Sequence, residues 1–114
     1  MSQPISVLVY PVEDLETSTA IFTALLGSEP YASAPYYVGF HVGDLEVGLD
    51  PNGHRQGQAG PVAYALVDDI TAGLAALGQA GAQTVQEPHD VGGGTLVATL
   101  KDPAGNVIGL RQNP

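Results

Sequence analysis

A short pattern that occurs twice places the strongest constraint on how this chain of 114 residues can fold. Residues 7–14 read Val-Leu-Val-Tyr-Pro-Val-Glu-Asp, and residues 62–69 read Val-Ala-Tyr-Ala-Leu-Val-Asp-Asp, at an offset of 62 − 7 = 55. Each copy is a strand-like run that ends in Val-acid-Asp, and a helix-like stretch follows it. A repeat of this length predicts two equivalent supersecondary units, neither of which buries its apolar face alone. It also predicts a cleft where the units meet.

The first copy predicts a strand, a helix and a hairpin in that order. Residues 5–12 are rich in Val, Ile and Tyr, which favours a strand. Asp14 is a suitable N-cap for a helix with apolar residues at helical spacing, and Gly27 suits its C-terminal end. Coil or a short strand follows at 29–33, where Pro30 is typical of an irregular or edge position.

The hairpin predicts which side chains share a face. The runs 36–42 and 45–50 flank Gly43-Asp44, a two-residue turn signal. The period of two then separates an apolar face, which we expect to meet the helix, from a second face that is left for a cavity. The apolar face comprises Val38, Phe40, Val42, Leu45, Val47 and Leu49. The cavity face comprises Tyr37, Gly39, His41, Glu46, Gly48 and Asp50.

The second copy predicts the same order after a polar, turn-rich linker. A strand at 62–67 precedes a helix at 70–80, with Asp69 as its cap, Gly81 at its end and three inward side chains, Ile70, Leu74 and Leu77. The second half then continues with a strand at 83–87, which Pro88 is expected to stop, and a glycine loop at 92–94. It ends with a hairpin formed by 95–101 and 107–111. Each half is therefore β-α-β-β-β, and we expect a single α+β domain at 1–114: module one at about 4–51, a linker at 52–60 and module two at about 61–112.

Composition excludes several classes of function. Asp and Glu number 12 against Lys101, Arg55 and Arg111, and three cations are too few for a nucleic acid-binding face or for attraction to an anionic membrane. Cysteine is absent, which removes disulfides and thiolate chemistry. The sequence shows no apolar run long enough to span a bilayer and no signal peptide pattern, so we expect a cytoplasmic protein.

The order of elements, with Val12-Glu13-Asp14-Leu15 in the first half and Lys101-Asp102-Pro103-Ala104-Gly105-Asn106 in the second, resembles the vicinal oxygen chelate superfamily. That superfamily includes glyoxalase I, extradiol dioxygenases, fosfomycin-modifying enzymes and bleomycin resistance proteins. The resemblance covers nearly the whole chain. It implies two βαβββ modules that curl into a half-open barrel around a ligand cavity, and it implies a homodimer.

The resemblance also assigns four positions to metal ligands in the metal-using members. These lie on the first and last strand of each module, and here they are Val7, Gly48, Val62 and Gly109. Divalent metals need donor side chains such as His, Asp, Glu or Cys, which Val and Gly do not offer. We therefore expect no metal and no cofactor, and we expect the glycines to leave more room for a ligand.

Three side chains are candidates for acid–base chemistry. His41 and Glu46 are expected to lie opposite each other across the hairpin, where a carboxylate can orient an imidazole and raise its basicity. His89 lies at the mouth of the 92–94 loop, and His54 lies in the linker, where it is expected to be structural or exposed. The expected ligand-binding residues form one set: Val7, Val9, Tyr37, Gly39, His41, Glu46, Gly48, Asp50, Val62, Tyr64 and Gly109.

Three functions remain open at this point. The leading hypothesis is a metal-free binding protein of the bleomycin resistance type that sequesters or carries an apolar or cationic small molecule. The first alternative is a metal-independent lyase or isomerase that uses His41 or His89 as acid or base. The second alternative is a metal-dependent lyase or dioxygenase with relocated ligands.

Overall fold

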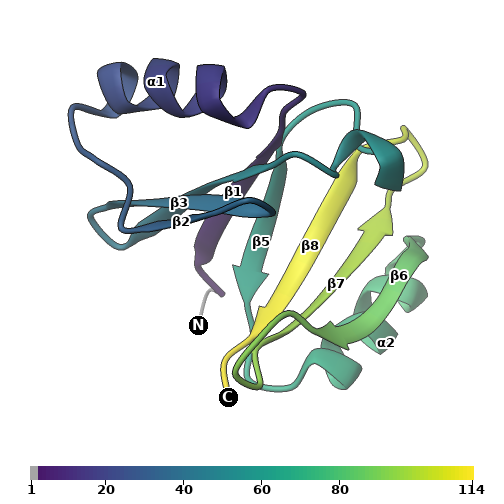
Figure 1. The fold of residues 1–114 in the computed structure, drawn as a ribbon. Coiled ribbons are helices and arrows are strands. Elements are labelled where there is room, and N and C mark those ends of the chain that lie inside the picture. Colours follow the sequence, from purple (N-terminus) through teal and green to yellow (C-terminus); the bar gives the residue numbers. More distant parts are fainter. Residues whose placement is uncertain (1–2) are drawn as a thin grey trace. The chain divides into compact units, whose positions relative to one another are not determined.

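A computed structural model describes residues 3–114, apart from the side chain of Gln56, and it shows an α+β fold of two βαβββ modules (Figure 1). Module one is taken here as the compact unit Ser6–Val62, and module two as Ala63–Pro114 with the described residues before Ser6. The elements of the first βαβββ run are β1 (Ile5–Pro11), α1 (Leu15–Leu26), β2 (Ala32–Ala34), β3 (Tyr37–Val42) and β4 (Leu45–Asp50). Those of the second are β5 (Val62–Leu66), α2 (Ile70–Ala80), β6 (Gln83–Asp90), β7 (Leu96–Lys101) and β8 (Val107–Gln112).

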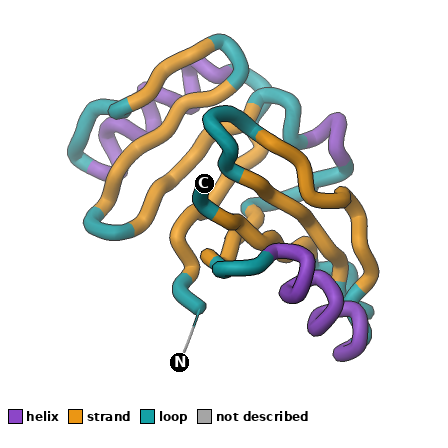
Figure 2. Tube along the Cα trace, turned by 90° about the horizontal axis from the view of Figure 1, so that it is seen from below, coloured by secondary structure: helices purple, strands orange, loops and turns teal. Residues whose placement is uncertain are grey.

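Each module orders its strands in the same way, although the chain connects them over different lengths. In module one the neighbours run β2-β3-β4-β1, and in module two they run β6-β7-β8-β5. The first and last strands of a module pair in parallel, while the strands of each hairpin pair antiparallel. Figure 2 shows a single helix lying along the strands of each module. One face of each set of strands is therefore covered by its own helix.

The two helices begin and end at the predicted residues. The Asp14 carboxylate accepts a hydrogen bond from the Thr17 N–H at 3.1 Å, and the Asp69 carboxylate accepts one from the Ala72 N–H at 3.1 Å. These bonds satisfy donors that a helix start leaves free. The hydrogen bonds from Thr17 hold the pKa of Asp14 below its usual value. Gly27 and Gly81 end the helices with φ of 70° and 114°, a left-handed conformation that glycine adopts without steric cost.

The β3–β4 hairpin has the predicted register, with His41 opposite Glu46 and Gly39 opposite Gly48. Most of the apolar face of this hairpin is buried, with Phe40 and Leu49 both at 0% exposure, but Val42 beside the turn is 40% exposed. The buried part packs against Leu15, Phe22 and Leu26 of α1. Burial of side chains of this size stabilises the fold by roughly 1.5–3 kcal/mol each. The opposite face of the hairpin is consequently held at a fixed register by this core.

Module two has an equivalent core around α2. Ile70, Ala98, Leu100 and Leu110 are buried, and Leu74 and Leu77 pack against them, which confirms the predicted inward face of α2. The turn before β8 is closed by Asp102, whose carboxylate accepts two hydrogen bonds from Asn106, each of 2.8 Å. The side-chain and backbone N–H groups of Asn106 hold the pKa of Asp102 below its usual value.

One predicted strand boundary is wrong. The strand expected to stop at Pro88 continues to Asp90, with irregular register between Thr84 and His89. β6 lies at the end of the strand order of module two, and a proline without an N–H is tolerated on such an edge strand or at a bulge.

The linker between the modules contains local structure. It includes a 3-10 turn at His54–Gln56 and a buried Gln58, whose backbone N–H donates to the Gly53 carbonyl.

Neither helix within residues 3–114 combines the length and the apolar character that a membrane crossing requires.

Candidate functional site

The predicted cavity face of module one is built from β1, β3 and β4. Antiparallel pairing of β3 with β4 puts Gly39 beside Gly48 and His41 beside Glu46. Parallel pairing of β1 with β4 puts Val7 beside Glu46 and Val9 beside Gly48. Because paired residues project to the same side of a sheet, all six belong to one face, opposite the face that α1 covers. The structure therefore brings together most of the ligand-binding residues expected in the first half of the chain.

A tyrosine and a carboxylate interact on this face. The Tyr37 hydroxyl donates a short hydrogen bond to Oε2 of Glu46, and both side chains are half-buried. A hydrogen bond to an ionised acceptor is roughly twice as strong as a neutral one. The Tyr37 hydroxyl therefore fixes the position of the Glu46 carboxylate, which shares this face of β4 with Gly48 and Asp50.

An aromatic stack lies beside this pair. The rings of Tyr31 and His41 are stacked, with centroids 3.7 Å apart and an interplanar angle of 22°. Tyr31 comes from the segment between α1 and β2, and its N–H donates to the Gly39 carbonyl at 2.9 Å. Tyr31 is 52% exposed and His41 is also exposed, so a ligand could contact both rings from solvent. Tyr31, Tyr37, His41 and Glu46 are called the aromatic–carboxylate cluster below.

Gly39 allows these side chains to come close to the backbone. A Cβ atom at this position would lie 2.9 Å from Cε1 of Tyr31 and 3.1 Å from Cε2 of Tyr37. The first of these separations is shorter than real Cβ contacts, so a larger residue would displace the Tyr31 ring. Sequence reasoning missed Tyr31, because it precedes a three-residue strand in a segment with no periodic pattern.

The expectation that the last-strand glycines leave empty room is wrong. A Cβ atom on Gly48 would lie 2.6 Å from Cε1 of Tyr37, and one on Gly109 would lie 2.6 Å from Cε2 of Tyr64. Each glycine is therefore covered by a tyrosine ring. In module one the ring comes from β3, whereas in module two it comes from β5, where Tyr64 pairs directly with Gly109.

These contacts bear on whether a metal ion fits the four positions that the resemblance assigns to ligands. Val7 and Val62 have no donor atom, and the tyrosine rings fill the space where side chains at Gly48 and Gly109 would lie. The residues at these positions therefore do not fit a divalent metal ion. Within residues 3–114, the structure also contains no group of three or more His, Asp and Glu side chains placed to hold one.

The remaining candidates are not members of the aromatic–carboxylate cluster. The Asp50 carboxylate accepts a hydrogen bond from the Asn52 N–H at 2.8 Å, which ties it to the turn after β4. Val62, Tyr64 and Gly109 belong to the β5–β8 ladder, and both Val62 and Tyr64 are buried. His89 is exposed on β6, with Nδ1 2.9 Å from the carbonyl oxygen of Glu87. His54 is exposed in the 3-10 turn, as expected.

A family model named the Glyoxalase/Bleomycin resistance protein/Dioxygenase superfamily matches residues 5–110. The chain belongs to this superfamily. The match covers both βαβββ modules, so the repeat in the sequence and the family agree on the fold. No curated protein matches the chain. Superfamily membership establishes a fold on which many activities are built, and it leaves the activity to be argued from the site.

Solved structures show the same superfamily fold at low sequence identity. A hypothetical protein from Bacillus halodurans C-125 has a TM-score of 0.81 at 13% identity, with 100% of this chain and 96% of that chain covered. A protein described as an NAD-dependent benzaldehyde dehydrogenase from Legionella pneumophila has a TM-score of 0.76 at 16% identity, with 95% and 98% covered. Methylmalonyl-CoA epimerase from Mycobacterium tuberculosis has a TM-score of 0.75 at 14% identity, with 100% and 93% covered. Identities of this size show a shared fold alone.

Proposed function

We propose that this superfamily member is a metal-free binding protein that holds a small cationic ligand with an aromatic or apolar body at the aromatic–carboxylate cluster. We further propose that it acts as a homodimer. The observation that carries the proposal is the arrangement of one carboxylate, fixed by the Tyr37 hydroxyl, beside two stacked rings with exposed surface. Small-molecule sites are commonly apolar surfaces with a few placed polar groups.

Charge and ring chemistry both favour a cation. Tyrosine rings attract cations over their faces with roughly 0.5–1 kcal/mol at exposed sites and more when water is excluded. The Glu46 carboxylate lies on the same face, opposite His41. The net charge of the chain, −9 at pH 7, attracts cations from solution as well. Tyr31, which is 52% exposed, supplies ring surface for the body of the ligand, while Val7 and Val9 beneath this face are buried.

A titration with (4-hydroxyphenyl)trimethylammonium, an aromatic cation, tests the proposal. We expect binding to shift the backbone amide resonances of Gly39 and Gly48 in heteronuclear NMR spectra. Tyr31→Ala removes one ring of the stack and should weaken binding about fivefold, consistent with about 1 kcal/mol for a cation over a ring. Tyr36→Ala is the matched control, because Tyr36 is 70% exposed and lies outside the stack. Equal affinity in wild type and Tyr31→Ala would contradict the proposal.

A further inference from the structure

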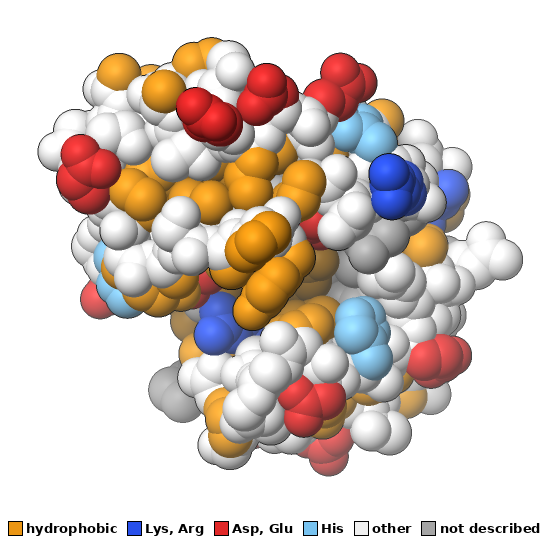
Figure 3. All heavy atoms as spheres, viewed as in Figure 1, with side chains coloured by type: hydrophobic (Ala, Val, Ile, Leu, Met, Phe, Trp, Pro, Cys, Tyr) orange, Lys and Arg blue, Asp and Glu red, His pale blue; other side chains and the backbone are white. Residues whose placement is uncertain are grey.

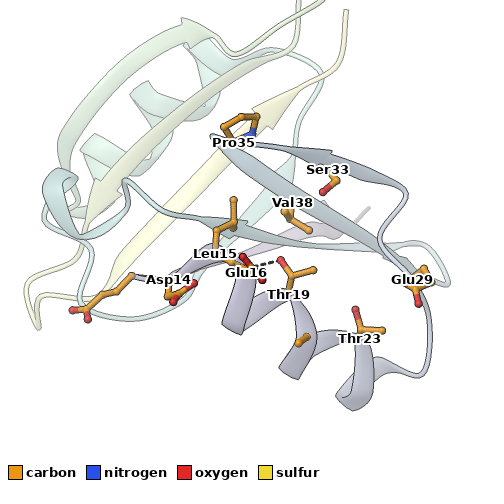
Figure 4. Close-up of a pocket in the computed structure, with 11 residues that line it drawn as sticks. Asp14, Leu15, Glu16, Thr19, Thr23, Glu29, Ser33, Pro35 and Val38 are labelled. Carbon is orange, nitrogen blue, oxygen red and sulfur yellow. Dashed lines mark hydrogen bonds between the residues drawn. The ribbon is translucent and has the colours of Figure 1, made fainter.

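A second surface of module one lies on the α1 side of the strands. A groove of about 1010 Å³ runs between α1 and the segment that contains β2 and the start of β3 (Figure 4). It contains none of the ligand-binding residues expected from the sequence. The lining residues are Glu13, Asp14, Leu15, Glu16, Thr19, Ala20, Thr23, Glu29, Ser33, Pro35 and Val38.

The floor of this groove is apolar and rigid. Val38 is 1% exposed and Leu15 packs against the core that contains it, so both belong to the packed interior of module one. Figure 4 shows Leu15 and Val38 between the helix and the strands, with Pro35 and Ser33 on the strand side. The Thr19 hydroxyl donates to the Leu15 carbonyl at 2.6 Å, which leaves its methyl group available to the groove. The packed core beneath the groove therefore holds its lining in place, and Leu15 and Pro35 are the larger apolar side chains that an occupant can contact.

The rim of the groove is acidic. Asp14 and Glu16 lie at one end and Glu29 lies at the other. Glu13, which precedes Asp14 in the chain, also lines the groove, and all four acids are exposed. Among the residues known to line the groove, none is Lys or Arg, and Arg55 is the only Lys or Arg in the sequence of module one. Figure 3 shows acidic side chains near the two ends of α1 on the face in view. Complementary charge favours a basic occupant, whereas a second copy of this chain would bring its own net charge of −9.

The strand beside the groove favours an extended occupant. β2 is the terminal strand of module one, so within the described part of this module only one side of it is paired, with β3. An edge strand presents backbone N–H and C=O groups that another extended chain can pair with. Recognition by strand addition draws affinity from these backbone bonds and specificity from the side chains.

We propose that the groove binds an extended, basic segment of a partner protein. The segment adds a strand beside β2, packs small apolar side chains on Leu15 and Pro35, and directs Lys or Arg side chains to the acids at the two ends. This site is separate from the aromatic–carboxylate cluster, which lies on the other face of the strands, so either proposal can fail while the other holds.

A fluorescein-labelled peptide of alternating lysine and valine, seven residues long, is the probe for this site. Anisotropy at low ionic strength should show saturable binding, and amides of Ser33 and Ala34 should shift and exchange more slowly in NMR spectra. Glu13→Lys/Glu29→Lys reverses the charge at both ends without altering an α1 residue and should weaken binding at least fivefold. Asp44→Lys/Glu87→Lys is the control, because it makes the same charge change at exposed acids outside the groove and should lose less than twofold.

These measurements distinguish specific binding in the groove from non-specific attraction of a basic peptide to an acidic protein. Equal losses in the two double variants, or spermine displacing the peptide without any effect on the β2 amides, would overturn the proposal in favour of a diffuse acidic surface. Binding of a glutamate-valine peptide with equal affinity would overturn it as well. Circular dichroism and thermal unfolding of both variants establish that each is folded. If the double variant is unfolded, Glu29→Lys alone provides a second test, because Glu29 lies between α1 and β2, outside both elements.

Discussion

Gly109→Ala is expected to lower the free energy of unfolding by about 2–3 kcal/mol, because the new methyl group has no space beneath the ring of Tyr64. The clash is with ring carbons close to the Tyr64 backbone, and Tyr64 is only 8% exposed, so the ring cannot swing into solvent. For a domain of this size the expected loss lowers the melting temperature by roughly 10 °C. Urea denaturation monitored by circular dichroism measures the change.

Two further variants make this result specific to the glycine–tyrosine contact. Gly78→Ala is the matched control, since a Cβ on this exposed glycine of α2 meets nothing within 4 Å, and alanine there should stabilise the protein by roughly 0.5–1 kcal/mol. The double variant Tyr64→Val/Gly109→Ala replaces the tyrosine with valine, the residue that pairs with Gly48 at the equivalent position of module one, Val9. Its loss of unfolding free energy should be smaller than the sum of the losses in Tyr64→Val and Gly109→Ala. Strictly additive losses would show that Tyr64 does not cover Gly109.

Glu46→Gln is expected to weaken binding of (4-hydroxyphenyl)trimethylammonium by about 10–30-fold, equivalent to about 1.4–2 kcal/mol. The substitution keeps the size and the hydrogen-bonding oxygen that faces Tyr37, but it removes the negative charge from the aromatic–carboxylate cluster. Binding of 4-tert-butylphenol, a neutral compound of the same shape, should change less than twofold. The difference between these two ligands, measured by NMR titration, isolates the contribution of charge.

Asp44→Asn controls for the loss of one negative charge from the chain. Asp44 is exposed in the turn of the same hairpin, two residues from Glu46, and it lies outside the aromatic–carboxylate cluster. Its replacement should lower affinity for the cation less than twofold. Equal losses for cation and neutral ligand in Glu46→Gln would show that this substitution perturbs the hairpin rather than the charge that a ligand meets.

The fold followed from local signals that act over a few residues. Asp14 and Asp69 cap helices because their carboxylates reach the N–H groups three residues on, and such contacts depend only on nearby sequence. The opposition of His41 and Glu46 followed from Gly43-Asp44, because a two-residue turn fixes the register of both strands. Positions on one face of the hairpin were therefore predictable as soon as the turn was recognised.

The details of the site depended on contacts between separate segments. Tyr31 reaches His41 from a segment with no periodicity, and the backbone bond from Tyr31 to Gly39 that places it has no sequence signature. The prediction of open space above Gly48 failed because a neighbouring ring can fill the space beside a glycine as well as a ligand can. Tyr37 fills it from a diagonal position on β3. The acidic groove beside α1 was missed because its residues come from the helix, the following loop and β2 together.

Native mass spectrometry of the protein purified gently from its own source tests the central claim most directly, because it reports the oligomer mass and any bound mass together. A metal-free binding protein is expected to give a homodimer without stoichiometric divalent metal. An organic adduct of low mass on wild type should be lost from Glu46→Gln and retained by Asp44→Asn. A dimer that carries one divalent metal ion per chain would contradict the account and favour the metal-dependent lyase or dioxygenase instead.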